Sequence, residues 1–562
     1  IPVAYKTGPN LSPPLTSSTS AKDRNINIRY DVVNVYSDAH KKLGNHFISG
    51  LVGYNQEHSI NTNFQADRKQ LISTNIPSIN LATGDQTTTE NIKEWAVQGL
   101  FYRLNYNYKE KYLLEFDGRY DGSSRFAAGH RWVFVPSASA GWVLSEEGFF
   151  ESVKKALHMD QFKIRGSYGV LGNQASVNEY DYLSILQSAK GGQILGGKQG
   201  TYVNPPVPIS DDFTWEKVST INVGADLSFL NNKLELSLDK YTRYTKNMLV
   251  PGKPLPGVFG ATSPTTNAAD LKTNGWELKL SWKDDVPVAG SPLSYNVTLA
   301  LSDSKTFITR FDNPTNSLTN YYKGMEIGEI WGLQTEGFFQ NAADLKNHAD
   351  QTAVGEDDNN YRYYVGDIKF KDRNNDGKVD FGNNTLDKPG DQTKIGNSAI
   401  HLPYSIDLSA AWKGFDVRVL LQGVAKRDWY PGNSNIYFWG IYAQPWTNVT
   451  VQNMDHWTPE TPNAYFPRVK AYAAEDAGME LGIPNDKYLQ NAAYLRVKNI
   501  TLGYTLPKSI LSKLKLANVH FYVSGENLFE YTKLKVKLDP EGLNGNIYPF
   551  QRTYSFGMNV NF

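Results

Sequence analysis

Strict alternation of apolar and polar residues recurs from one end of the chain to the other. Near the C-terminus, small or polar residues separate Tyr554, Phe556, Met558, Val560 and Phe562. A period of two places alternate side chains on opposite faces of a β-strand. No window approaches the roughly 18 consecutive apolar residues that a membrane-spanning helix needs. The sequence therefore predicts an all-β fold.

Three pairs of alternating segments are each joined by a tight turn, as in β-hairpins. They are 221–229 with 234–238 across Asn231 and Asn232, 406–412 with 415–421 across Lys413 and Gly414, and 100–106 with 112–120 across 109–111. Long polar or aromatic stretches occupy 171–214, 341–400 and 427–488. Short turns alternating with long loops are typical of transmembrane β-barrels, whose short turns lie in the periplasm.

The alternation predicts about sixteen strands. Their centres lie near residues 29, 47, 100, 116, 138, 165, 224, 238, 278, 298, 334, 407, 419, 500, 522 and 557. Many of them reach about ten residues, longer than the usual five or six, and aromatic side chains gather near strand ends, as in interface girdles. These features favour a transmembrane antiparallel β-barrel. A soluble sandwich, propeller or lectin-like fold is the alternative.

Composition excludes several classes of function. Lys and Arg together number 57, as do Asp and Glu, so the chain lacks the excess positive charge with which proteins bind nucleic acid. It contains no cysteine, which removes cysteine nucleophiles, thiolate zinc sites and disulfides. The nine histidines are scattered. The sequence thus predicts no catalytic residues and no organic cofactor.

A series of short motifs resembles those of the SusC/RagA-like TonB-dependent transporters. They are YRLNY at 102–106, RYDGSSRF at 119–126, PSASAGW at 136–142, KIRGSYG at 163–169 with GNQ at 172–174, WTPETP at 457–462, YLRVKNITLGY at 494–504 and SGENLF at 524–529. They follow the family's order over most of residues 94–562, which we assign to the C-terminal part of the barrel. Residues 1–93 look like a loop and an early barrel hairpin.

The resemblance implies a barrel of about twenty-two strands in the outer membrane, of which this chain would supply about sixteen. It also implies a plug that is not in this sequence, TonB acting on that plug, and a SusD-like surface lipoprotein at the extracellular mouth. We expect the missing strands and the plug to come from a preceding segment or a separate chain. The expected cargo is an oligosaccharide, with a peptide as the alternative. Rival classes are a passive porin, a barrel enzyme and a soluble glycan-binding protein.

The loop 372–380 has the ligand spacing of an EF-hand calcium loop. Its predicted ligands are Asp372, Asn374, Asp376, the carbonyl of Lys378, and Asp380, with Gly377 at the sharp turn. Position 12 is Asn383 rather than the usual Glu, so any calcium site should be weak. A turn of Asp, Asn and Gly residues without metal is the alternative.

A second cluster is aromatic and lies in a stretch assigned to an extracellular loop. Its predicted contact residues for cargo or partner are Trp429, Tyr430, Tyr437, Trp439, Tyr442 and Trp446. Aromatic faces suit sugar rings and apolar side chains. Packing within the loop, or contact with a partner protein, is the alternative interpretation.

Overall fold

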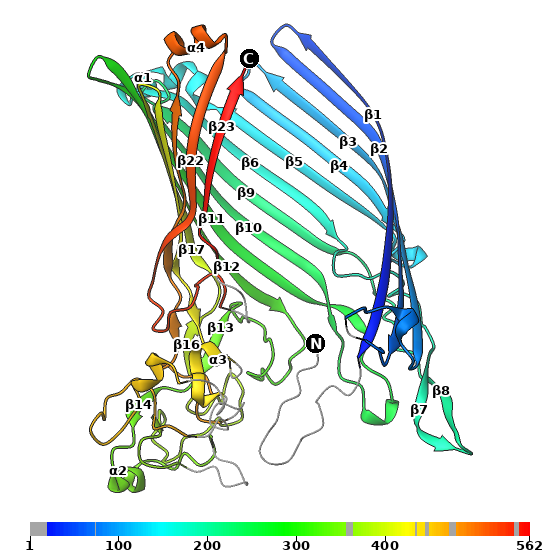
Figure 1. Ribbon diagram of the computed structural model, residues 1–562. Helices are drawn as coiled ribbons and strands as arrows, with labels where there is room; N and C mark the ends of the chain where they lie inside the picture. The colour runs from blue at the N-terminus through cyan, green and yellow to red at the C-terminus, as the bar shows by residue number, and fades with distance from the viewer. Residues whose placement is uncertain are drawn as a thin grey trace.

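The chain folds around one large antiparallel sheet in the computed structural model, which describes residues 19–73, 75–355, 363–432, 435–443, 449–470, 479–543 and 550–562. Fifteen strands of this described part form the sheet, and neighbours follow chain order without a crossover (Figure 1). They are β1 (Ser20–Leu43), β2 (His46–Lys69), β3 (Gln86–Tyr108), β4 (Tyr112–Ser123), β5 (Trp132–Val143), β6 (Met159–Asn173), β9 (Glu216–Phe229), β10 (Leu234–Pro251), β11 (Thr265–Val288), β12 (Ser291–Arg310), β17 (His401–Trp412), β18 (Phe415–Lys426), β21 (Tyr494–Thr505), β22 (Asn518–Thr532) and β23 (Thr553–Asn561).

In the part of the chain that the structure describes, four two-stranded sheets and several short helices lie outside the large sheet. The small sheets pair β7 (Gln187–Leu195) with β8 (Lys198–Asn204), β13 (Glu329–Gly332) with β16 (Thr393–Asn397), β14 (Thr335–Phe338) with β15 (Ile368–Phe370), and β19 (Asp428–Trp429) with β20 (Gln490–Asn491). The α-helices are α1 (Glu151–Ala156), α2 (Ala342–Asn347), α3 (Ile436–Trp439) and α4 (Lys508–Leu514). Single 3₁₀ turns are η1 (Ile79–Leu81), η2 (Ala128–His130), η3 (Leu144–Glu146), η4 (Gly148–Phe150), η5 (Gly257–Phe259), η6 (Gly440–Tyr442) and η7 (Val451–Met454). None of the helices described is long and apolar enough to cross a membrane.

The three predicted hairpins are confirmed. Asn231 and Asn232 have φ of 60° and 59°, and Lys413 and Gly414 have φ of 48° and 88°. Tight hairpin turns need such left-handed residues because their twist matches that of the flanking strands. In Figure 1 the short turns and the C-terminus lie at the top, and the long connections lie at the bottom.

Fifteen of the sixteen predicted strand centres fall in the large sheet; the one near residue 334 does not. Residue 334 lies between β13 and β14, which belong to two different small sheets. Leu333 and Phe338 are buried there, so the alternation reflects packing within a loop. Periodicity alone cannot separate that case from a strand of the barrel wall. β3 runs across residue 93, so the sheet is continuous where the sequence suggests a boundary.

The sheet has one apolar face and one polar face. On β4, the large side chains of Tyr112, Leu114 and Phe116 lie on the apolar face and are exposed, whereas Glu115 and Asp117 alternate with them. The pairing of β4 with β5 places Tyr112 opposite Trp142 and keeps the two rows aligned. A wall of this kind meets hydrocarbon on one side and water on the other.

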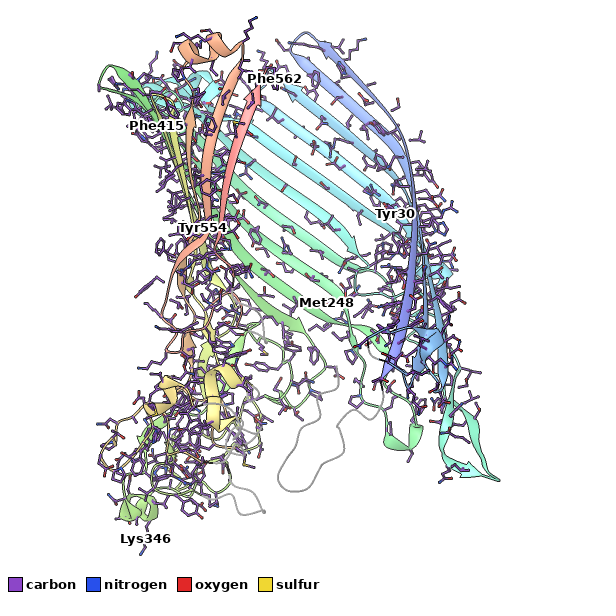
Figure 2. All side chains as sticks on the ribbon, in the orientation of Figure 1. Tyr30, Met248, Lys346, Phe415, Tyr554 and Phe562 are labelled. Carbon is purple, nitrogen blue, oxygen red and sulfur yellow. The ribbon has the colours of Figure 1, made fainter. Side chains whose placement is uncertain are left out.

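The largest hydrophobic core lies in the long loops and not in the wall. Its buried residues come from the connections β12 to β17, β18 to β21 and β22 to β23. We call these three connections together the loop body. Figure 2 shows side chains crowded at that end, where Lys346 is labelled, while Phe415 and Phe562 lie near the opposite end. The fold therefore joins a long β-wall to a packed loop body at its long-loop end.

Candidate functional site

Ion pairs tie neighbouring strands together on the polar face. Arg165 of β6 donates to Asp226 of β9 at 3.0 Å and to Asp239 of β10 at 2.6 Å. Between them lies Gly224, which is opposite both Arg165 and Asp239 in the registers of the sheet. A Cβ atom at Gly224 would lie 2.6 Å from Arg165 Nη1. The missing side chain thus makes room for a bridge across three strands.

The same face carries two further pairs on other strands. Arg103 donates to Asp117 at 2.7 Å between β3 and β4, and Arg418 donates to Asp407 at 2.6 Å between β17 and β18. Charge-assisted hydrogen bonds of this geometry fix both partners in place. These pairs could not be predicted from the sequence, because pairing depends on strand register.

The loop body is held together by a buried cluster of charges that sequence reasoning missed. Asp367 is fully buried and accepts from Arg468 Nε at 2.7 Å and pairs with Lys470 Nζ at 2.8 Å. Lys470 also forms an ion pair with Glu480, which is fully buried and accepts from the backbone N–H of Ile368 at 2.6 Å. The cluster joins segments about a hundred residues apart, as the separation of 101 residues between Arg468 and Asp367 shows.

Burial raises the pKa of the Glu480 carboxyl above its ordinary value. The charge of Asp367 acts in the same direction, whereas Lys470 opposes the shift. Burial also raises the pKa of Tyr465, in the same loop body, to about 12. The causes are those of a water-poor interior, in which charged forms are disfavoured.

The predicted calcium loop folds as a turn around Asp372. Asp372 Oδ1 accepts from the N–H of Asn375 at 2.7 Å, and its Oδ2 accepts from the N–H of Gly377 at 2.9 Å. Gly377 has φ of 84°, as a sharp left-handed turn requires. Within the described ranges, no three acidic or imidazole side chains come together as a metal site.

The other predicted ligands of this loop also accept or make hydrogen bonds within the chain. Asn374 accepts from the N–H of Asp376 at 2.9 Å, and Asp376 accepts from the N–H of Lys378 at 2.9 Å. Asp380 accepts from the N–H of Gly382 at 2.7 Å. A carboxylate has about four lone-pair positions, so these bonds leave acceptor capacity. Calcium at this loop stays a prediction.

Asp391 closes the base of the same loop and is not among the ligands predicted from the sequence. Asp391 is fully buried and accepts from the N–H of Arg373 at 2.7 Å and from that of Asp380 at 2.9 Å. It thus holds the two ends of the loop 372–380 together. Nothing in the spacing of Gly390, Asp391 and Gln392 distinguishes such a residue in advance.

Most of the predicted aromatic contact residues lie in the core of the loop body. Trp439 and Tyr442 are 0% exposed and Trp429 is 6% exposed. Tyr430 packs against the same core, and its hydroxyl donates to the carbonyl of Ile483 at 2.8 Å. In this structure Trp439 and Tyr442 have no surface with which to contact a ligand. High aromatic density suits a core as well as a binding surface, so composition could not decide between them.

Two residues of that aromatic set remain as candidates for contact. Tyr437 is 53% exposed on α3. Trp446 lies outside the described residues. The alternative interpretation of loop packing therefore applies to the buried members of the set. Among the described residues of the set, Tyr437 is the one that carries the contact prediction.

Comparison with known proteins agrees with this architecture. Residues 4–528 match the family described as TonB dependent receptor-like, beta-barrel. The chain is 26% identical to TonB-dependent receptor P3 of Formosa agariphila over 94% of this chain and 52% of that protein. It is 25% identical to TonB-dependent receptor SusC of Bacteroides thetaiotaomicron, over 94% of this chain and 50% of the relative.

A solved structure shows the same fold. The RagAB peptide transporter superposes with a TM-score of 0.77 at 19% identity, covering 98% of this chain and 57% of that one. The chain spans about half the length of the curated relatives that it matches. Because the family match extends over most of the chain and the sheet has the family's fold, this chain belongs to the TonB-dependent receptor-like β-barrel family.

Proposed function

We propose that the chain forms part of the wall of a TonB-dependent importer of a nutrient, working as the SusC-like barrel of a two-component complex. The observation that carries the proposal is a β-wall that matches the TonB-dependent receptor family. Ion pairs cross its polar face, and the packed loop body lies at its long-loop end. Family membership makes the protein an outer-membrane β-barrel, and the activity that we propose for it is transport, not catalysis. The apolar face of the wall is accordingly its lipid-facing side, and the polar face lines the lumen.

The proposed partners act at opposite ends of the barrel. A SusD-like surface lipoprotein would cover the loop body, and TonB would act from the periplasm through a plug. Similarity to SusC and to RagA in the RagAB complex supports both partners. Selectivity would then lie in the loops and the plug, because the lumen of so large a barrel is wide.

The cargo that we propose is an oligosaccharide, the cargo that the resemblance to the SusC/RagA-like transporters implies. A peptide is the second candidate, and the structural similarity to a peptide transporter favours it. Uptake of labelled oligosaccharides and labelled peptides by cells expressing the full-length protein separates these cargo classes. Uptake of peptide alone would reject the oligosaccharide proposal and leave the import mechanism intact.

Dependence on TonB separates an active importer from a passive porin. We expect deletion of TonB, or collapse of the proton gradient, to abolish uptake while the protein remains in the outer membrane. A porin would continue to admit cargo down its gradient. Undiminished uptake without TonB would therefore reject the proposal of energised import.

Exposed aromatic residues of the loop body test its part in recognition. We expect Tyr437→Ala to weaken uptake or retention of the lipoprotein in a pull-down, because this ring is available to a partner. Tyr321→Ala is a matched control, since Tyr321 is a loop tyrosine that is 51% exposed. Equal behaviour of the two variants would count against a specific role for Tyr437.

A further inference from the structure

The connection between β5 and β6 at the short-turn end contains an unusual helical segment. Residues 148–150 form η4 and residues 151–156 form α1, so the chain is helical over 148–156. His158, with φ of 49°, follows the end of the helix. Figure 1 shows α1 at the end opposite the loop body. Because short turns face the periplasm, this segment lies at the periplasmic side of the barrel.

The segment carries a row of exposed apolar side chains. Phe149 is 69% exposed, Val153 is 40% exposed and Leu157 is 54% exposed. A spacing of four residues places these three side chains on one face of a helix. Such a face is costly to leave in water, and in the described residues no other element covers it.

This row continues the lipid-facing surface of the wall. The ring of Phe149 lies 6.3 Å from that of Trp142 on β5, and the ring of Phe150 lies 5.7 Å from that of Phe162 on β6. Trp142 is opposite Tyr112 in the sheet, in the row of apolar residues that faces lipid. The apolar face of the helix is therefore continuous with an established membrane contact.

Polar contacts mark the level of the membrane interface beside the helix. The hydroxyl of Tyr112 donates to Glu147 at 2.6 Å, and Trp142 Nε1 donates to the same carboxylate at 3.2 Å. Tyr and Trp occupy the headgroup level, with the ring in an apolar layer and the polar tip in a wet one. Residues 148–157 begin directly at that level.

An open cavity of about 580 Å³ lies between this segment, the turn from β9 to β10, and β11. Its charged lining residues are Lys154, Lys155 and Lys233 together with Glu151, Asp160 and Asp284. Met159, Leu230 and Trp282 form an apolar part of the lining. Cations and carboxylates side by side, next to apolar groups, match a zwitterionic headgroup that carries a phosphate and an ammonium.

We propose that residues 148–157 and the adjoining cavity form a phospholipid-binding site for the periplasmic leaflet. The row of Phe149, Val153 and Leu157 lies among the upper acyl carbons, as in interfacial amphipathic helices. The headgroup occupies the cavity, where its phosphate faces the lysines. This site anchors the turn to the membrane surface and does not depend on the identity of the cargo.

Single-cysteine spin labelling tests the position of the apolar row. The 562 residues contain no cysteine, so Phe149→Cys, Val153→Cys and Leu157→Cys can be made in full-length protein freed of any other cysteine. In vesicles of phosphatidylethanolamine and phosphatidylglycerol, we expect these labels to be more accessible to oxygen than to a water-soluble nickel chelate. Lys413→Cys, at an exposed short turn outside the cavity, is the control and should show the reverse. Labels at 153 and 157 as accessible to nickel as the label at 413 would overturn the proposal.

Native mass spectrometry of the detergent-extracted protein tests the headgroup cavity. We expect Lys154→Gln combined with Lys233→Gln to retain fewer phosphatidylethanolamine molecules than the unchanged protein. Lys413→Gln is the matched control, because Lys413 lies at another short turn and does not line the cavity. The double variant removes two partly exposed ion pairs, that of Lys154 with Glu146 at 3.6 Å and that of Lys233 with Asp284 at 2.5 Å, and such pairs contribute little to folding. Equal lipid retention in the double variant and the control would overturn the assignment of the headgroup site.

Discussion

Gly224 decides whether the bridge of Arg165 across three strands can form. A Cβ atom there would lie 2.6 Å from Arg165 Nη1 and 2.8 Å from Asp239 Oδ1. We expect Gly224→Ala to displace the guanidinium and to lower the free energy of unfolding by about 1.5–3 kcal/mol, the range for hydrogen bonds to charged groups. The measurement is the temperature at which the barrel loses its folded mobility in gel electrophoresis.

Gly166→Ala is the control for that substitution. Gly166 follows Arg165 on β6, but the atom nearest to its added Cβ is 3.8 Å away. This change should leave the transition temperature close to that of the unchanged protein. The same temperature for both variants would show that the bridge does not stabilise the wall.

Lys470 should matter more to the loop body than Glu480 does. Replacing Lys470 with Met leaves Asp367 and Glu480 as two buried carboxylates with one cation fewer, and loss of one partner of a buried pair costs about 3–5 kcal/mol. Glu480→Gln keeps an acceptor for the N–H of Ile368 and leaves Lys470 beside Asp367, so its effect should be smaller. Limited proteolysis of the loop body on whole cells measures both. Greater cleavage of the Gln variant would contradict the argument.

At the scale of elements, proteolysis of the loop 372–380 distinguishes stabilisation by bound calcium from stabilisation by hydrogen bonds. If calcium binds, its charge adds to the bonds around Asp372, so we expect EDTA to speed proteolysis within 366–397 and added calcium to restore protection. Asp391→Ala should speed cleavage with or without the ion, because it removes the acceptor of two backbone N–H groups. Identical cleavage in EDTA and in calcium would assign the turn to hydrogen bonds alone.

At the scale of the whole molecule, the two edge strands of the sheet need hydrogen-bond partners for their backbone groups. In the described residues, β1 pairs only with β2, and β23 pairs only with β22. Each unpaired backbone group in hydrocarbon costs several kcal/mol. We therefore expect both edges to pair with strands other than these fifteen in the membrane-embedded full-length protein.

Hydrogen exchange in the full-length protein measures that pairing. The amides of β1 and β23 should exchange as slowly as those of β10, which is paired on both sides. Fast exchange along either edge would contradict the prediction. So would a disulfide formed directly between cysteines placed on β1 and β23, since it would indicate closure by these strands alone.

The sequence alone determined the all-β class, the wall strands and the turns of the three hairpins. Alternation is a local property, and a tight turn such as Asn231 with Asn232 needs only neighbouring residues, so both can be recognised without a structure. The resemblance of the motifs over 94–562 likewise identified the family that the comparisons show. The sequence could not show that the segment near residue 334 lies in the loop body and not in the wall, because the alternation has the same period in both places.

Only the tertiary structure decided which side chains meet. Asp391 reaches the N–H groups of Arg373 and Asp380, and Asp367 reaches Arg468 across 101 residues. It also decided that Trp439 is a core residue while Tyr437 is exposed, although both lie on the four-residue helix α3. Burial and ion pairing depend on how distant loops pack together, and that information is not contained in the spacing of residues along the chain.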